Sequence, residues 1–242
     1  MDWTSHDAAM ADYLRFHAPR FDYLLRLLRD RLRSGQRVLD IGWSQLSNRM
    51  HEELGVAVDA MGFDADGTIP SGRYYHFDLN DCQATERLRR DLPAYDAIVF
   101  AEVLEHLHTS PALVLRYLSS LLKPGGLLIV QTPNGVALPR RIKMFLGRNP
   151  YELIREDATN PGHFREYTAN ELRNYGTNVG LMLASIEARS YFDFRYAHHG
   201  RTTRGSRVVG GIKNFLYPWL PTSMRPGLTA VFQAPTVARQ AA

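Results

Sequence analysis

The chain has 242 residues, of which 45% are hydrophobic and 22% charged, a length and composition that suit a single α/β domain with a sizeable core. No segment approaches the roughly 20 consecutive apolar residues of a membrane span, and the amino terminus lacks the basic-then-apolar order of a secretory signal, so we expect a cytoplasmic protein. The net charge of +4 is spread along the chain and decides little about partners.

The first 35 residues carry apolar side chains at helical spacing. Tyr13, Leu14 and Phe16 form one group, and Leu24 and the leucines around it form a second. Because proline lacks a backbone donor and disrupts helix interiors, residue 19 predicts a break between two helices. We expect residues 1–35 to cover a site built by a second unit, residues 36–242.

Beyond residue 36, short apolar runs alternate with helical patterns. The predicted strands are residues 37–42, 56–63, 74–77, 97–100, 127–131 and 182–192, with residues 229–232 as a last edge strand. A Lys-Pro-Gly-Gly turn at 123–126 ends a helix that begins at residue 111 and starts the next strand. This alternation predicts a Rossmann-like, doubly wound, mostly parallel sheet of seven strands with helices on both faces and ligands at the strands' carboxyl ends.

Two carboxylates and an imidazole follow the fourth predicted strand directly. If the chain turns helical at Glu102, then Glu102, Glu105 and His106 share one helix face at the carboxyl end of that strand. That edge is where open α/β sheets bind their ligands. The sequence therefore predicts a functional site at this point.

Five motifs in this order resemble the class I S-adenosylmethionine-dependent methyltransferases. They are Val-Leu-Asp-Ile-Gly at 38–42, Gly-Phe-Asp at 62–64, Phe-Asp-Leu at 77–79, the acidic run at 102–107 and Leu-Lys-Pro-Gly-Gly at 122–126. The resemblance covers residues 36–192. It implies S-adenosyl-L-methionine as cofactor, whereas a dinucleotide would need a Gly-x-Gly-x-x-Gly loop that is absent here.

The resemblance also implies which residues hold that cofactor. Gly42 would let the backbone approach its methionine part, and Asp40 would face its ammonium group. Asp64 would accept from the ribose hydroxyls and Asp78 from the adenine amino group. The remaining cofactor candidates are Leu79, packing on the adenine ring, Ser44 in the loop after Gly42, and Glu102.

A narrower resemblance concerns a metal ion. Glu-x-x-Glu-His at 102–106, followed by His-Phe-x-Glu-Tyr-Thr at 163–168, is similar to metal-dependent small-RNA 2′-O-methyltransferases and partly to ubiquinone-pathway catechol O-methyltransferases. It implies that Glu102, Glu105, His106 and His163 bind Mg²⁺ or Mn²⁺, which would lower the pKa of an acceptor hydroxyl. His106 or His163 is then the candidate general base. In the alternative, Glu105 caps a helix and His106 lines the pocket without metal.

Substrate specificity is expected in an insertion at residues 135–162 and in the chain after residue 190, since the core of such folds is shared. The candidate substrate residues are Arg140, Arg141, Tyr151 and Tyr191, because arginines and aromatic rings suit sugars. We favour a sugar hydroxyl on a saccharide or glycolipid. In the alternative, the basic segment is only a solvated face and Tyr191 packs on the core.

Three other functions remain open. One is methylation of an RNA 3′-terminal ribose, which the positive charge permits but no auxiliary RNA-binding module supports. Another is methylation of a catechol or quinol, and the third is a catalytically silent subunit that binds a partner. An amphipathic stretch at residues 208–220 makes a homodimer plausible, although it can equally pack on its own sheet.

Overall fold

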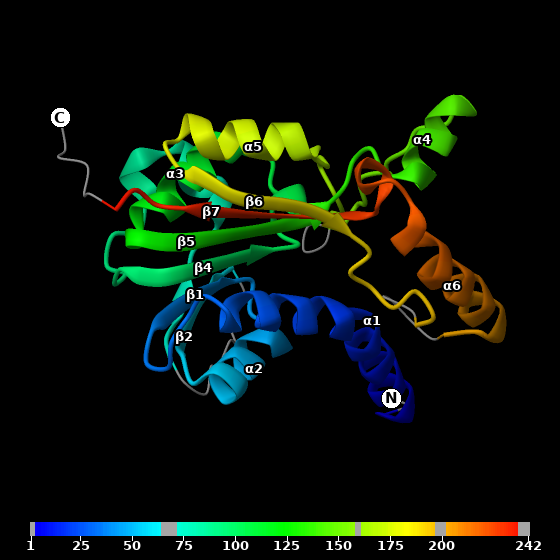
Figure 1. The fold of residues 1–242 in the computed structure, drawn as a ribbon, viewed down its shortest axis with the longest axis horizontal. Helices are drawn as coiled ribbons and strands as arrows, with labels where there is room; N and C mark the ends of the chain where they lie inside the picture. Colours follow the sequence, from blue (N-terminus) through cyan, green and yellow to red (C-terminus); the bar gives the residue numbers. More distant parts are fainter. Residues whose placement is uncertain (1–2, 64–71, 158–160, 197–201, 237–242) are drawn as a thin grey trace.

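The computed structural model describes residues 3–63, 72–157, 161–196 and 202–236, which form one seven-stranded sheet with helices on both faces (Figure 1). The strands are β1 (Arg37–Ile41), β2 (Ala57–Gly62), β3 (Tyr74–His76), β4 (Tyr95–Ala101), β5 (Leu122–Pro133), β6 (Met182–Arg189) and β7 (Gly227–Gln233). Their order is β3-β2-β1-β4-β5-β7-β6, and β7 runs opposite to the other six strands. The predicted Rossmann-like fold is confirmed.

The prediction that residues 229–232 form an edge strand is wrong. β7 lies between β5 and β6, and six of its seven residues are buried, whereas β6 occupies the edge. The difference is physical: β7 buries apolar side chains on both faces, with Phe232 in one core and Val231 in the other, while β6 includes Ser185 and Glu187. The length of a short apolar run does not indicate whether the strand lies in the middle of the sheet or at its edge.

The helices are α1 (Trp3–Arg29), α2 (Gln45–Leu54), α3 (Pro111–Ser120), α4 (Leu138–Phe145), α5 (Ala169–Asn178) and α6 (Arg204–Leu216). Short 3₁₀ turns lie at Leu79–Gln83, Thr85–Arg87, Leu104–His106, Tyr217–Trp219 and Thr222–Met224. α3 ends close to its predicted end before the Lys-Pro-Gly-Gly turn, which lies inside β5. Within the described part of the chain, none of the helices has the length and apolarity that crossing a bilayer requires.

The amino-terminal region is one helix and not two. α1 continues through Pro19, and Figure 1 shows it changing direction along its length. Its carboxyl-terminal half packs Phe21, Leu24 and Leu28 against the sheet, and this burial holds the helix together despite the missing proline N–H. α1 is therefore part of the core as well as a neighbour of the site.

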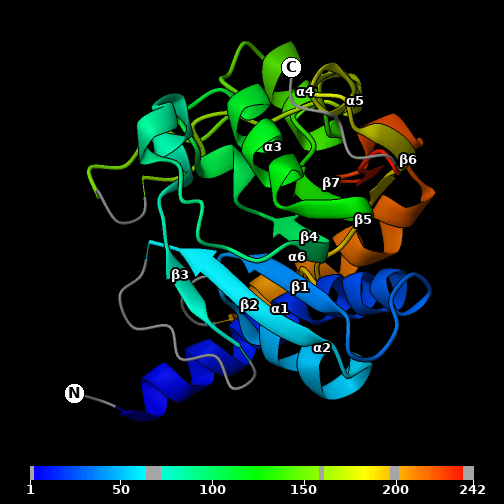
Figure 2. The same cartoon turned by 90° about the vertical axis from the view of Figure 1, so that its left-hand side faces the viewer.

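Two hydrophobic cores flank the sheet. One joins α1 and α2 to one face of the strands, and the other joins α3 and α5 to the opposite face, as Figures 1 and 2 show. The cores fix the strands so that the carboxyl ends of β1, β4 and β5 lie at a common edge. The residues that follow these strand ends make up the candidate site.

Candidate functional site

The chain leaves β4 through an unusual backbone conformation at Glu102. Its φ of 58° is the only positive φ of a non-glycine residue in the described ranges. Its N–H donates to the carbonyl of Gln131 at 2.8 Å, so strand pairing extends to this position. The predicted helical start at Glu102 is therefore wrong, and a 3₁₀ turn at Leu104–His106 follows instead. Left-handed backbone at a non-glycine residue costs about 1–2 kcal/mol and often marks functional sites.

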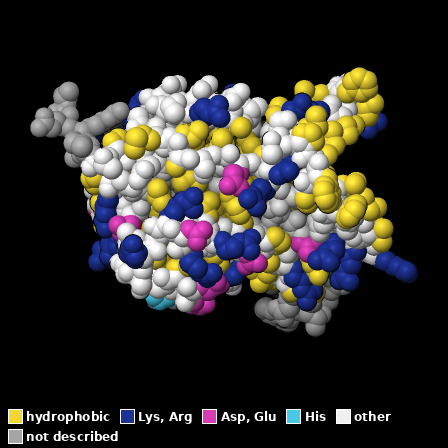
Figure 3. All heavy atoms as spheres, in the orientation of Figure 1, with side chains coloured by type: hydrophobic (Ala, Val, Ile, Leu, Met, Phe, Trp, Pro, Cys, Tyr) yellow, Lys and Arg dark blue, Asp and Glu magenta, His cyan; other side chains and the backbone are white. Residues whose placement is uncertain are grey.

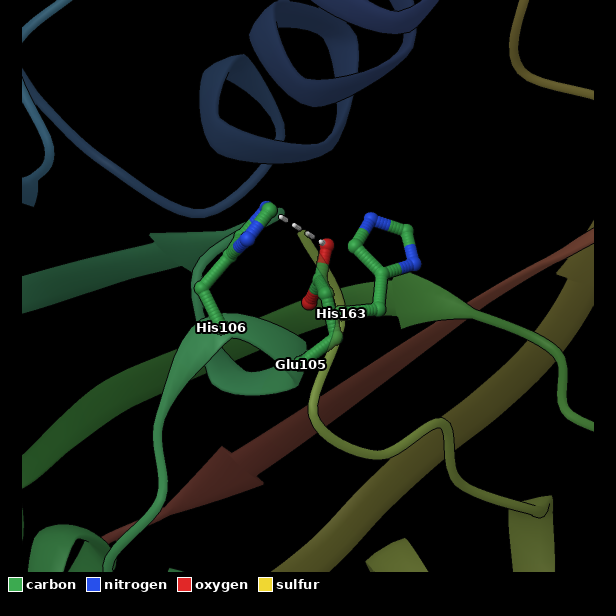
Figure 4. Close-up of side chains that lie close together, drawn as sticks. All are labelled: Glu105, His106 and His163. Atoms are coloured by element: carbon green, nitrogen blue, oxygen red, sulfur yellow. Dashed lines mark ion pairs between the residues drawn. The ribbon is translucent and has the colours of Figure 1, made fainter. Parts of the chain in front are cut away.

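Glu105, His106 and His163 nevertheless meet, with one ligand-type atom of each lying within 4.8 Å of the others. Figure 4 shows the two imidazoles on either side of the Glu105 carboxylate. His163 reaches this place because the N–H of Phe164 donates to the carbonyl of Glu105 at 2.8 Å, which ties the later loop to the turn after β4. Sequence motifs 57 residues apart thus form one cluster.

The Glu105 side chain is fully buried. One carboxylate oxygen accepts a hydrogen bond from the Thr132 hydroxyl at 2.9 Å, and the other has no hydrogen-bond partner among the described residues. Burial raises the pKa of Glu105 well above its usual value, and the nearby Glu102 raises it further. A buried carboxylate oxygen without a donor is where a cation or a ligand hydroxyl would be stabilising.

Each histidine of the cluster is held through its Nδ1 atom. His106 Nδ1 lies 2.9 Å from the carbonyl oxygen of Gly162, and His163 Nδ1 lies 2.9 Å from a carboxylate oxygen of Glu166. Because both partners are acceptors, Nδ1 carries a proton in each ring, and in a neutral ring the lone pair is then on Nε2. Burial, followed by the charge of His163, lowers the pKa of His106, which keeps it neutral near pH 7.

This donor set fits a divalent metal ion. A carboxylate and two imidazoles with free Nε2 atoms, each ring fixed by an acceptor on its other nitrogen, is the usual pattern around metal-bound histidines. His106 Nε2 lies 4.0 Å from the Glu105 carboxylate. Imidazoles favour a borderline ion such as Mn²⁺ over Mg²⁺, which prefers oxygen ligands. Of the predicted ligands, only Glu102 stands outside this cluster.

Glu102 is partly buried beside a buried charge that the sequence did not reveal. Burial raises the pKa of its carboxyl group, and Arg20 of α1 opposes that rise. Arg20 is itself buried, and its Nε has no hydrogen-bond partner among the described residues. No motif surrounds Arg20, and its helix was interpreted from apolar spacing alone. Only the packing of α1 over the strand ends could identify it.

The cofactor candidates of the first strand occupy its carboxyl end. Asp40 is buried and accepts a hydrogen bond from the Ser47 hydroxyl at 2.5 Å, and burial raises its pKa to about 7. Gly42 has a φ of 77°, and a Cβ there would lie 3.2 Å from Val103, so the position requires glycine. Ser44 is the N-cap of α2 and accepts from the N–H of Leu46. This edge fits the close approach of a small polar ligand.

The other cofactor candidates are less directly exposed. Asp78 caps the turn at Leu79–Gln83 by accepting from the N–H of Asn80 at 2.9 Å. Leu79 is buried within the core on the α3 side. Its side chain therefore presents little open surface for the expected contact with the adenine ring. Asp64, the predicted ribose ligand, lies outside the described residues.

Three of the four predicted substrate residues have protein partners. Arg140 forms an ion pair with Glu166 and donates to the carbonyl of Pro150 at 2.9 Å. Arg141 donates to the carbonyl of Val136 at 2.6 Å and lines a separate cavity of about 460 Å³. Tyr151 is half exposed under the Arg140 guanidinium, 5.5 Å from it. Their predicted role in substrate binding stays a prediction.

Tyr191 is a core residue. Only 1% of its surface is exposed, and its ring lies 5.0 Å from that of Tyr23 in α1. The expectation that it contacts substrate is therefore wrong, because it follows the end of β6 and packs inward. The sequence allowed Tyr191 either to contact substrate or to pack on the core. The packing of α1, about 170 residues earlier in the chain, decides for the core.

Comparison with known proteins agrees with the Rossmann-like fold. A family model described as a methyltransferase domain matches residues 11–186, while no curated protein matches the chain. Among solved structures, a SAM-dependent methyltransferase from Archaeoglobus fulgidus is 15% identical, with a TM-score of 0.54 and coverage of 88% of this chain and 94% of the other.

Two further structures show how widely this fold is used. Phosphoethanolamine N-methyltransferase 2 from Haemonchus contortus, in complex with S-adenosyl-L-methionine, is 13% identical, with a TM-score of 0.54 and coverage of 88% and 52%. The [4+2]-cyclase SpnF is 17% identical, with a TM-score of 0.56 and coverage of 89% and 82%. At these identities the structures establish the fold, and the acceptor has to be argued from the site.

Proposed function

The chain belongs to the class I S-adenosylmethionine-dependent methyltransferases, as the methyltransferase-domain model matched over most of its length shows, and from this premise we propose that it methylates a sugar hydroxyl of a saccharide or glycolipid with the help of a divalent metal. The observation that carries this proposal is the cluster of Glu105, His106 and His163 at the carboxyl end of β4. A fully buried carboxylate with one unpaired oxygen, between the neutral His106 imidazole and the His163 imidazole, is suited to hydroxyl chemistry.

The cofactor would lie at the neighbouring strand ends. S-adenosyl-L-methionine supplies an electrophilic methyl group on a sulfonium. Gly42 allows a close backbone approach, and Asp40 can accept from the ammonium group. The buried guanidinium of Arg20 suits the carboxylate of the methionine part, since its Nε lacks a partner. Asp64, Asp78, Leu79 and Ser44 stay cofactor-binding predictions.

The metal would be held by Glu105, His106 and His163, with Glu102 next to them. When bound, such an ion lowers the pKa of a coordinated hydroxyl. Gly162 and Glu166 fix the two rings so that both Nε2 lone pairs are available. His106, neutral near pH 7, can accept the hydroxyl proton at Nε2 wherever that atom is not a ligand. The proton would move to His106 as the oxygen bonds to the methyl carbon and the bond from that carbon to the sulfonium sulfur breaks, which leaves S-adenosylhomocysteine.

The acceptor class is supported by what surrounds this cluster. Tyr151 and Phe164 are each about two-fifths exposed, and Phe164 follows His163 directly. Aromatic rings of this kind pack against the apolar faces of sugars, and a vicinal diol offers two oxygens to a metal ion. An RNA ribose end and a catechol share the diol, so acceptor assays have to include both.

The test is methyl transfer from labelled S-adenosylmethionine to short saccharides, first with EDTA and then with Mn²⁺ or Mg²⁺ restored. We expect EDTA to abolish transfer and metal to restore it, and we expect Glu105→Gln to lose turnover while it still binds the cofactor in calorimetry. Glu166→Gln should weaken Mn²⁺ binding about 10- to 100-fold, because His163 loses its anionic partner.

The matched control is Glu152→Gln, an exposed glutamate of the same region, which should leave both readouts unchanged. Transfer that ignores EDTA and survives Glu105→Gln would contradict the metal-assisted mechanism. Transfer to a ribonucleotide end or a catechol, but to no saccharide, would contradict the sugar acceptor.

A further inference from the structure

α6 presents its apolar side chains to solvent. Val208, Val209, Ile212, Phe215 and Leu216 are each at least half exposed, with Phe215 reaching 70%. Their spacing of one, four, seven and eight residues places all five on one face of the helix. Trp219, in the turn that follows, continues the stripe and is 80% exposed. We call these six residues the α6 stripe.

The opposite face of α6 attaches the helix to the protein. Gly210 is buried there, and a methyl group added to it would overlap the carbonyl oxygen of Phe194. Asn214 donates to the Asp193 carboxylate at 2.6 Å and accepts from the N–H of Phe194 at 3.0 Å. A surface helix normally buries its apolar face and exposes its polar one. α6 does the reverse, so its orientation is fixed and its apolar face has no partner within the described chain.

α4 repeats this arrangement on a smaller scale. None of its residues is buried, and Ile142, Phe145 and the following Leu146 share one exposed face, with Phe145 at 90%. Both helices project from the same end of the molecule in Figure 1, and Figure 3 shows hydrophobic atoms gathered over both. Exposed apolar surface on two separate elements at one end of a protein indicates a docking surface.

The charges around these faces specify the partner. Neither α4 nor α6 contains an acidic residue. On a helical projection, Arg204 and Arg207 border the α6 stripe on one side and Lys213 on the other. Lys143 and Arg148 add charge beside α4. Apolar side chains bordered by basic ones suit a bilayer interface, where the chains enter the acyl region while long cationic side chains reach the headgroups.

We propose that α4 and α6 together form a docking surface for an anionic phospholipid bilayer. The surface lies at the edge of the sheet that carries the candidate site. α4 follows the carboxyl end of β5 directly, and α6 leads to β7, whose first residue, Gly227, pairs with Pro133 at that same end. Docking would bring the Glu105 cluster toward the headgroups. It does not depend on which acceptor is methylated.

The test is co-sedimentation of the whole protein with phosphatidylglycerol-containing vesicles and with pure phosphatidylcholine vesicles, without cofactor or metal. We expect binding to the anionic vesicles that weakens with salt. Ile212→Ser with Phe215→Ser should reduce partitioning at least about tenfold, because two apolar side chains no longer leave water. Arg204→Glu with Lys213→Glu should abolish the preference for anionic lipid.

The matched control is Met182→Ser. Met182 is 49% exposed, close to the 54% of Ile212, but it starts β6 at the opposite end of the sheet. It should bind vesicles as the unchanged protein does, and equal melting temperatures should show that all variants fold. Absence of binding to anionic vesicles, or binding that the Ile212 and Phe215 changes leave intact, would overturn the proposal. So would a dimer in sedimentation that these changes dissociate without any vesicle binding, because the partner would then be a second copy.

Discussion

Asp40 and Glu105 are buried and Glu102 is partly buried at the carboxyl ends of β1 and β4, and burial raises the pKa of each carboxyl group. Holding three such groups ionised near one another costs folding free energy. Arg20 offsets part of that cost for Asp40 and Glu102. The charges of Glu102 and Glu166 raise the pKa of Glu105 further, so a bound metal would stabilise this carboxylate most. The site is thus arranged for ligands at the expense of stability.

Asp40→Asn should stabilise the cofactor-free protein at alkaline pH. The folded pKa of about 7 lies above the usual 3.8, so the folded state binds more protons and loses stability as pH rises through this window. Asparagine keeps an acceptor for Ser47 but has no charge to bury. We expect a gain of a few kcal/mol at pH 8, at about 1.4 kcal/mol per pKa unit, and a smaller gain at pH 5.

Urea unfolding at the two pH values measures this difference, and calorimetry should show weaker cofactor binding by the same variant. Asp91→Asn is the control, because hydrogen bonding to Arg89 lowers the pKa of this exposed group. It should give no stabilisation at pH 8. An Asp40→Asn gain that is equal at pH 5 and pH 8 would mean that ionisation of Asp40 is not the cause.

At the scale of elements, backbone geometry decided what residue spacing could not. The Glu-x-x-Glu-His spacing suggested one helix face, but the left-handed Glu102 and the 3₁₀ turn after it separate Glu102 from Glu105 and His106. The loop at 162–165 then supplies His163 through backbone hydrogen bonds to Glu105. Arg140 of α4 forms an ion pair with Glu166, and Glu166 in turn holds the His163 ring. The insertion is thereby linked to the position of that ring.

The two adjacent glycines of α6 should respond in opposite ways to alanine. A methyl group at Gly210 would overlap the backbone of Phe194, whereas one at Gly211 would meet nothing within 4 Å. Gly211→Ala should therefore stabilise the helix by up to about 1 kcal/mol, through higher helix propensity. Gly210→Ala should displace α6 and cost about 1–3 kcal/mol, as overpacking typically does.

Limited proteolysis before α6 and thermal unfolding check this pair. Faster cleavage is expected only for Gly210→Ala. Gly211→Ala is the matched control, because the two variants have the same amino-acid composition. Equal behaviour of the two variants would show that α6 is not held by its glycine face, and the orientation of the α6 stripe would then have to be revised.

At the scale of the whole molecule, the sheet is stabilised by a core on each face. The smaller core needs α1, because Phe21, Leu24, Leu25 and Leu28 cover apolar strand residues that would otherwise face solvent. The division into residues 1–35 and 36–242 therefore describes coverage of the site and does not imply that the second part folds alone. Arg20 lies on the same helix, so α1 contributes to both the core and the site.

Removal of residues 1–34 should prevent native folding. Five large buried apolar side chains, including Leu27, would be lost, at about 1.5–3 kcal/mol each, which is comparable to the whole stability of a typical domain. Near-UV circular dichroism and the cooperativity of thermal unfolding measure this outcome. Removal of residues 1–11 is the control, since the described buried residues of α1 begin at His17. A cooperative unfolding transition in the protein that lacks residues 1–34 would contradict a structural role for α1.

The sequence by itself determined the sheet, the alternation of strands and helices and the place of the site. These follow from local patterns: apolar runs such as 38–41, glycine and proline at turns, and polar residues directly after a strand. Only the tertiary structure decided that β7 is central, that Tyr191 is buried, that Arg20 and Glu166 belong to the site, and that α6 faces outward. Each of these depends on what a distant segment places against the residue, and no local pattern encodes that contact.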